Sequence, residues 1–151
     1  MSLKLKQQLI TTCENYVEVR INRVLAGIKD LDEVLKMESK SSAGDKYETG
    51  RAMINLEFDK LLIQLEQYKS LKKTLAFAGQ NPNLGIIGLG SLVKTSAANY
   101  LISIPAGEIL VENEKFYAIG INSPIAQALL GKKVDENFSF NGNMNKILLI
   151  D

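Results

Sequence analysis

The chain has 151 residues, one cysteine, no histidine and a formal net charge of +1, from 18 Lys and Arg against 17 Asp and Glu. The absence of histidine excludes Ser-His-Asp and Cys-His catalysis, an imidazole general base and any zinc site with a histidine ligand. Because the basic residues form no cluster, duplex nucleic acid is not expected as the main partner.

The lone Cys13 has no second cysteine for an intramolecular disulfide, which is typical of a protein from the reducing cytoplasm. The N-terminal stretch is too polar for a secretory signal, and the longest apolar runs, such as "LGIIGLG" and "ILLI", are far shorter than a membrane span. We therefore expect a cytoplasmic protein that does not contact the membrane.

Residues 1–78 carry apolar side chains at helical spacing on both sides of the polar stretch "KSSAGD". This pattern predicts an antiparallel coiled-coil hairpin, with arms of roughly 30 residues, or about 45 Å at 1.5 Å per residue. Leu3, Leu9, Tyr16 and Leu25 widen the first stripe, and Lys72 interrupts the second. The two stripes consist of Ile10, Cys13, Val17, Ile21, Val24, Ile28, Leu31 and Leu35, and of Ile54, Phe58, Leu61, Leu65, Tyr68 and Leu75.

Two carboxylates, Asp45 and Glu48, follow Gly44 in the loop between these helices. One interpretation is that they are solvated charges at a loop tip. The other is that they hold a metal ion at the end of a long rod. Two carboxylates alone bind Mg²⁺ weakly, because the ion prefers six oxygen ligands. Such a tip could only complete a site that another molecule supplies.

The pattern changes after residue 78, where Gly79 is expected to end the second helix and "GQNPN" marks a domain boundary. Residues 79–151 carry short β-type runs: "GSLVKTS", "NYLISI", "KFYAIGI", "NFSF" and "KILLI". The stretch "SPIAQALLG" predicts one short helix, with Ser123 as N-cap, Pro124 at its first position and Gly131 as its stop. We therefore predict an α+β protein, in which the hairpin precedes a small antiparallel sheet wrapped around one helix.

The glycines of "GIIGLG", from Gly85 to Gly90, superficially suggest a phosphate-binding loop. They lack the spacing G-x-G-x-x-G and precede no long helix, so glycines at bends or close approaches in a small sheet are the favoured interpretation. Cys13 lies on the apolar stripe and is expected in the core. Tyr16 and Tyr68 are expected to pack within the hairpin.

The run "INSPIAQALLGKKVDENFSF" resembles the C-terminal signature of the Gre family of transcript cleavage factors. "GSLV", from Gly90 to Val93, is similar to the family's entry into its C-terminal sheet. Gly44-Asp45-x-x-Glu48 is similar to the family's tip motif, at the same place between two helices. The resemblance covers most of the chain in the same order. The residues that match the C-terminal signature are Asn122, Ser123, Pro124, Ile125, Ala126, Leu129, Leu130, Gly131, Lys132 and Asp135.

This resemblance implies a monomeric protein that binds bacterial RNA polymerase and has no catalytic activity or cofactor of its own. An FKBP-like domain, residues 79–151, would dock at the rim of the secondary channel through Asn122, Ser123, Pro124 and Ile125. The coiled coil, residues 1–78, would enter the channel. Asp45 and Glu48 would then help to hold a Mg²⁺ ion shared with the polymerase, which activates a water that cleaves the 3′ end of a backtracked transcript.

The tip departs from the family pattern, because Arg51 stands where the family has an acidic residue and Ala52 replaces an aromatic one. A guanidinium there could pair with Asp45 or Glu48 and oppose a divalent cation. Two hypotheses therefore stay open: a factor that stimulates cleavage, and a Gre-like regulator or inhibitor that binds polymerase without stimulating cleavage. A prolyl isomerase and an unrelated coiled-coil adaptor are further alternatives.

Overall fold

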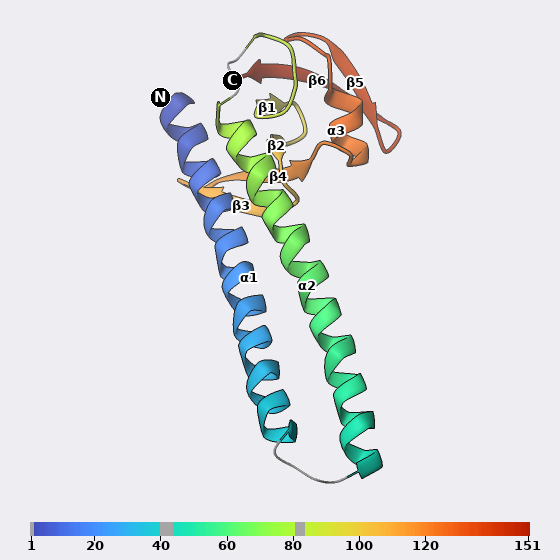
Figure 1. Ribbon diagram of the computed structural model, residues 1–151. Coiled ribbons are helices and arrows are strands. Elements are labelled where there is room, and N and C mark those ends of the chain that lie inside the picture. The colour runs from blue at the N-terminus through green and yellow to red at the C-terminus, as the bar shows by residue number, and fades with distance from the viewer. Residues whose placement is uncertain (1, 40–43, 81–83) are drawn as a thin grey trace. The chain divides into compact units, whose positions relative to one another are not determined.

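The computed structural model describes the backbone of residues 2–39, 44–80 and 84–151, and the side chains of these residues except 2, 38–39 and 44–49. Two long helices, α1 (Ser2–Ser39) and α2 (Gly44–Gln80), come first (Figure 1). A six-stranded, mostly antiparallel sheet and one short helix follow, so the α+β fold is confirmed. These elements are β1 (Leu92–Thr95), β2 (Asn99–Ser103), β3 (Gly107–Val111), β4 (Glu114–Gly120), α3 (Pro124–Leu129), β5 (Asn137–Phe140) and β6 (Asn143–Ile150).

The chain forms two compact units. The distal hairpin comprises residues 17–70. The sheet unit is discontinuous and comprises residues 1–16 and 71–151. The first turns of α1 and the last turns of α2 therefore belong to the same unit as the sheet. The boundary predicted between residues 78 and 79 lies within the last turn of α2 and stays a prediction.

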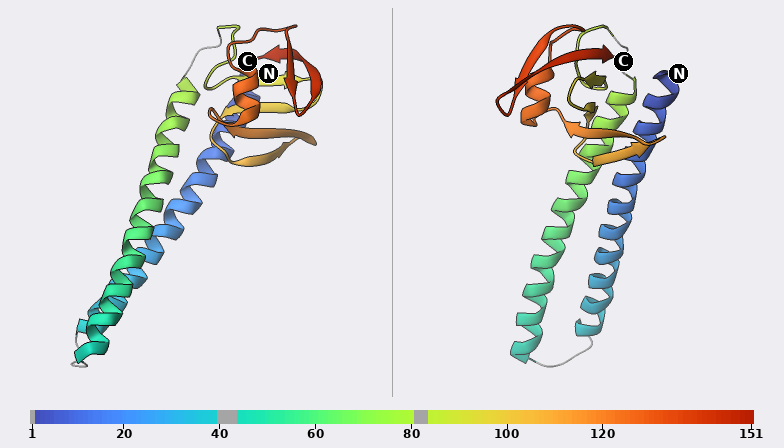
Figure 2. Two further views of the ribbon diagram at one scale, coloured as in Figure 1. Left: turned by 90° about the vertical axis from the view of Figure 1, so that its right-hand side faces the viewer. Right: turned by 180° about the vertical axis from the view of Figure 1, so that it is seen from behind.

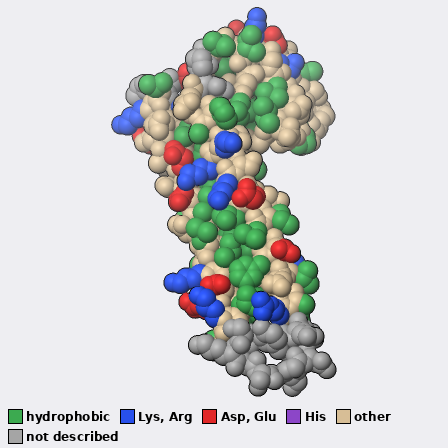
Figure 3. All heavy atoms as spheres, in the orientation of Figure 1, with side chains coloured by type: hydrophobic (Ala, Val, Ile, Leu, Met, Phe, Trp, Pro, Cys, Tyr) green, Lys and Arg blue, Asp and Glu red, His purple; other side chains and the backbone are tan. Residues whose placement is uncertain are grey.

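The distal hairpin is held together by the two predicted stripes, whose described members are buried or half-buried. Val17, Ile21, Val24 and Leu65 are the most buried of them in this unit. The arms come close at Gly27, because a Cβ there would lie 3.4 Å from a methyl carbon of Leu61. In the face drawn in Figure 3, hydrophobic side chains lie along the hairpin between groups of charged ones.

The sheet has the strand order β3-β4-β2-β1-β6-β5. All neighbours are antiparallel except β2 and β4, which pair in parallel with Leu101 opposite Ala118. The sequence predicted an antiparallel sheet, which the other strand pairs confirm and this pair corrects. A parallel pair needs a long connection, and here the chain from β2 passes through the whole of β3 before it returns as β4.

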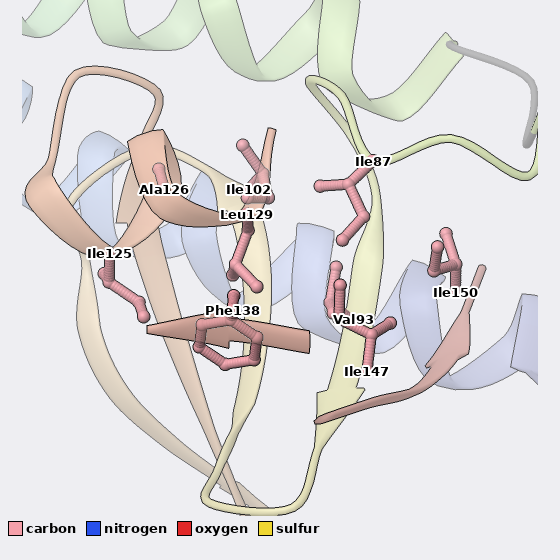
Figure 4. Packing of buried hydrophobic residues seen from close by; sticks show 9 residues of the cluster. All are labelled: Ile87, Val93, Ile102, Ile125, Ala126, Leu129, Phe138, Ile147 and Ile150. Carbon is pink, nitrogen blue, oxygen red and sulfur yellow. The ribbon is translucent and has the colours of Figure 1, made fainter. Parts of the chain in front are cut away.

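One face of the sheet packs against α3 and forms the core in Figure 4. Successive strand residues point to opposite faces. Val93 and Ile102 therefore lie in this core, while their neighbours Leu92 and Leu101 face the other side. The core residues are Ile87, Val93, Ile102, Ile125, Ala126, Leu129, Phe138, Ile147 and Ile150.

The opposite face of the sheet is covered by the ends of the two long helices that belong to this unit (Figure 2). Leu9 and Cys13 of α1, and Leu75 and Ala78 of α2, are almost completely buried. The ammonium of Lys6 donates a 3.4 Å hydrogen bond to the backbone carbonyl of Asp151. The sheet thus has an apolar layer on each side.

One sequence prediction about these elements was wrong, and one strand was missed. Gly79 does not end α2, which continues to Gln80. A glycine inside a helix is tolerated where packing compensates, and a Cβ at Gly79 would lie 3.8 Å from Ile10. Strand β3 was not predicted, because it is an edge strand in which Ile109 is the single fully buried residue. Its burial pattern carries no clear alternation.

Candidate functional site

The predicted metal-holding residues, Asp45 and Glu48, occupy early positions of α2, which begins at Gly44. Their side chains lie outside the described residues. Arg51, three positions after Glu48, is exposed in the same helix. The described side chains include no cluster of three or more Cys, Asp or Glu residues that could hold a metal ion.

The predicted docking residues lie where β4 ends and α3 begins, and Ser123 organises this turn. Its Oγ donates a 2.8 Å hydrogen bond to the carbonyl of Gly120 and accepts one of 3.3 Å from the amide of Ala126. With φ −67° and ψ 151°, Ser123 is the N-cap of α3, and Pro124 occupies its first turn. This confirms the predicted start of the helix.

These four docking residues differ in accessibility. Asn122 and Pro124 are exposed, Ser123 is half-buried, and Ile125 is only 8% exposed within the core. Ile125 and Ser123 therefore position the turn. Asn122 and Pro124 are the side chains of this group that a partner could reach.

The end of α3 is tied to the glycine-containing segment before β1. Gly131, with φ 82°, ends the helix as predicted. Its amide donates to the carbonyl of Ile87 at 2.9 Å, and the amide of Ile87 donates to the carbonyl of Lys132 at 2.9 Å. This reciprocal pair holds the turn after α3 against residue 87.

The glycine run from Gly85 to Gly90 uses its amides inside the protein. Gly88 donates to Oγ of Ser91 at 3.0 Å, and Gly90 donates to the carbonyl of Ile102 at 2.7 Å. A phosphate-binding loop needs such amides free to face the ligand. Gly90 instead lets the chain pass close to α2, since a Cβ there would clash with the backbone carbonyl of Ala78.

Cys13 lies in the core, as predicted. Burial raises the pKa of its thiol from 9.0 to about 11; the Ser103 hydroxyl opposes this increase and Glu14 adds to it. Ser103 is itself buried, and its Oγ makes no hydrogen bond of ordinary geometry among the described residues. A buried, protonated thiol is unsuited to nucleophilic or redox chemistry.

A groove that sequence reasoning missed lies between the first three turns of α1 and strand β3. Its walls are Leu3 to Thr12 on one side of that helix, and Leu110 and Val111 of the strand. Its volume is about 810 Å³. No local signal could have indicated it, because its walls are about a hundred positions apart in the sequence.

Comparison with known proteins adds no family assignment. The chain matches neither a protein-family model nor a curated protein. Along the described ranges 2–39, 44–80 and 84–151, none of the helices combines the length and the apolar character that crossing a membrane requires.

Proposed function

We propose that the protein is a Gre-like transcription factor of the cytoplasm. It binds bacterial RNA polymerase at the secondary channel and stimulates the polymerase to cleave backtracked transcripts. The observation that carries the proposal is the signature run from Asn122 to Asp135, in a chain whose helical hairpin has Gly44-Asp45-x-x-Glu48 at the start of its second helix.

The roles of the signature residues support the proposal. Ser123 caps α3, Gly131 ends it in the left-handed region, and Ala126 and Leu129 lie in the core. These matching residues fix the N-cap, the buried face and the end of a helix at set spacings. A match at such positions arises by chance less often than a match at surface residues. The resemblance thus concerns how this domain folds. Of the four residues proposed to dock, Asn122 and Pro124 are the exposed ones.

The chemistry of the proposal divides the metal site between two proteins. Asp45 and Glu48 stand three positions apart in α2, a spacing that makes residues neighbours on a helix. They would supply two carboxylate ligands, and the polymerase would supply the remaining ligands and the RNA. The shared Mg²⁺ lowers the pKa of a bound water and stabilises the charge that develops during hydrolysis.

Arg51 supports a second candidate function, a Gre-like regulator that occupies the channel without stimulating cleavage. It follows Glu48 by three positions in α2, and a guanidinium at that spacing can form a charge-assisted bond with a carboxylate. A carboxylate engaged in this way is a poorer ligand for a divalent cation.

Transcript cleavage by a stalled, backtracked elongation complex tests the proposal, with polymerase affinity measured separately by pull-down. The protein is expected to accelerate cleavage. Asp45→Asn and Glu48→Gln should abolish most of the acceleration and leave affinity unchanged, because they remove only the charge that Mg²⁺ requires. Asp59→Asn, an exposed carboxylate elsewhere on α2, is the matched control and should behave as wild type.

The outcomes distinguish the two candidates. Binding without acceleration, together with a gain of cleavage in Arg51→Glu, would favour the regulator. Absence of binding to intact polymerase would overturn both. Asn122→Arg should weaken binding without unfolding the domain, since Asn122 is exposed and its side chain takes no part in the cap.

A further inference from the structure

Strand β3 presents an open edge. It is the first strand in the order β3-β4-β2-β1-β6-β5, and its pairing with β4 is continuous from Gly107 to Val111. The turn that follows has φ values of 51° and 65° at Glu112 and Asn113, which are typical of a two-residue type I′ hairpin. In such a hairpin Val111 and Glu114 exchange backbone hydrogen bonds. Further along the two strands, non-hydrogen-bonded and hydrogen-bonded pairs then alternate. The backbone groups of Glu108 and Leu110 therefore point away from β4.

Among the described residues, this edge carries few of the usual protections against strand addition. Proteins protect edges with proline, bulges, charges or a covering segment. Strand β3 has no proline and no bulge, and the carboxylate of Glu108 is 3.4 Å from the ammonium of Lys115 on β4. Leu110 is 62% exposed. At the opposite edge of the sheet, the outward positions of β5 are Asn137 and Ser139, which carry neither a charge nor an exposed apolar side chain.

The groove beside β3 has the dimensions and walls of a peptide site. Its volume of about 810 Å³ lies within the usual range for ligand sites, roughly 300–1,000 Å³. One wall is Leu110 and Val111 of the strand, and the other is α1 between Leu3 and Thr12, both in the sheet unit. An extended peptide between them could pair with the strand through its backbone and contact the helix with its side chains.

Charge and polarity indicate what such a peptide carries. Lys4 is the single charged side chain among the residues that line the groove. It has no ion-pair partner in the described part of the chain. Leu3, which is 84% exposed, and Val111 add apolar surface. We propose that the groove binds an extended segment of a partner protein, rich in apolar residues and bearing one acidic side chain that pairs with Lys4. This inference does not depend on binding to polymerase.

A fluorescent peptide with the sequence Val-Thr-Val-Glu-Val, acetylated and amidated at its ends, tests the proposal with the full chain by anisotropy titration. We expect saturable binding and slower hydrogen exchange at the amides of Glu108 and Leu110. The amide of Ser139 should not change. The same peptide N-methylated at every residue has no backbone N–H left to donate to a strand and should bind at least about tenfold more weakly.

Variants at the groove separate backbone pairing from charge. Leu110→Pro removes one outward N–H and leaves the bonds to β4 in place, so it should weaken binding by about tenfold. Ser139→Pro makes the equivalent change at the opposite edge and should have no effect on binding. Lys4→Glu should weaken binding of the acidic peptide, and a peptide with Lys in place of Glu should then recover it.

Several results would overturn the proposal. Equal affinity of the N-methylated peptide would mean that no strand is added. Protection at Ser139 in place of Leu110 would move the site to the other edge. A dimer of the free protein in sedimentation velocity, dissociated by Leu110→Pro, would assign the edge to a second copy of the chain.

Discussion

Gly90 provides a quantitative test of how closely the segment before β1 approaches α2. It has φ +93°, and a Cβ there would clash with the carbonyl oxygen of Ala78 and lie 3.2 Å from its carbonyl carbon. These are backbone atoms, so no side-chain rotation can relieve the overlap. Gly142 is the matched control, because its φ is +79° but nothing lies within 4 Å of its Cβ position.

The difference between the unfolding free energies lost in the two substitutions measures the cost of disturbing the close contact. Gly142→Ala should cost about 1–2 kcal/mol of unfolding free energy, the strain of a left-handed L-residue. Gly90→Ala carries the same strain and must also shift the chain away from Ala78. That shift strains the 2.7 Å hydrogen bond from Gly90 to Ile102 and the 3.0 Å bond from Ile102 to Ser91. With overpacking at about 1–3 kcal/mol, its total should reach about 3–5 kcal/mol.

Urea denaturation followed by circular dichroism measures both free energies. At about 3 °C per kcal/mol, Gly90→Ala should lower the Tm by about 9–15 °C and Gly142→Ala by about 3–6 °C in thermal unfolding. If the two substitutions cost the same, the close approach of Gly90 to α2 does not exist in solution. The explanation of the glycine run as a packing feature would then be wrong.

Three further predictions concern the core and the caps. Ser123→Ala should lower the free energy of unfolding by about 1 kcal/mol through loss of the N-cap, and Ser123→Thr should restore most of it, both measured in urea. The thiol of Cys13 should not react with a disulfide reagent at pH 8 until the protein unfolds. Folding raises the pKa of the Cys13 thiol from 9.0 to about 11, so the unfolded state loses this proton first. Stability should therefore fall more steeply between pH 9 and 11 in wild type than in Cys13→Ala. Leu65→Ala should cost about 2–5 kcal/mol, whereas Leu62→Ala, at a 48% exposed position of the same helix, should change stability by less than about 0.5 kcal/mol.

The helices were predictable because their signal is long and repeated. Val17, Val24 and Leu65 lie on stripes of many members, so the period outweighs any single position. Leu3 and Leu25 were expected to widen the first stripe and are exposed instead, at 84% and 47%. Apolar residues away from the centre of a stripe carry no information about which partner, if any, covers them.

The sheet and the candidate sites were predictable only where the determinants are local. Ser123 and Gly131 act on their immediate neighbours, and both roles follow from residue type and position. The parallel pairing of β2 with β4 joins segments separated by a whole strand, and β3 has a single buried residue, so neither left a local pattern. The proposed metal site of Asp45 and Glu48 is not determined locally either, because a shared site depends on ligands from a second molecule.

The division of the sheet unit into residues 1–16 and 71–151 makes the distal hairpin an insertion within another unit. If residues 17–70 were an unstructured loop, closing it would cost roughly 3–4 kcal/mol of chain entropy. If the two helices instead pair progressively from the loop between them, the chain closes in short steps, and the cost of one long loop closure does not arise. Adding or removing matched turns in both arms changes where the tip ends but leaves this closure unaffected. The length of the hairpin can therefore be changed as one cassette, while the sheet unit keeps its sequence.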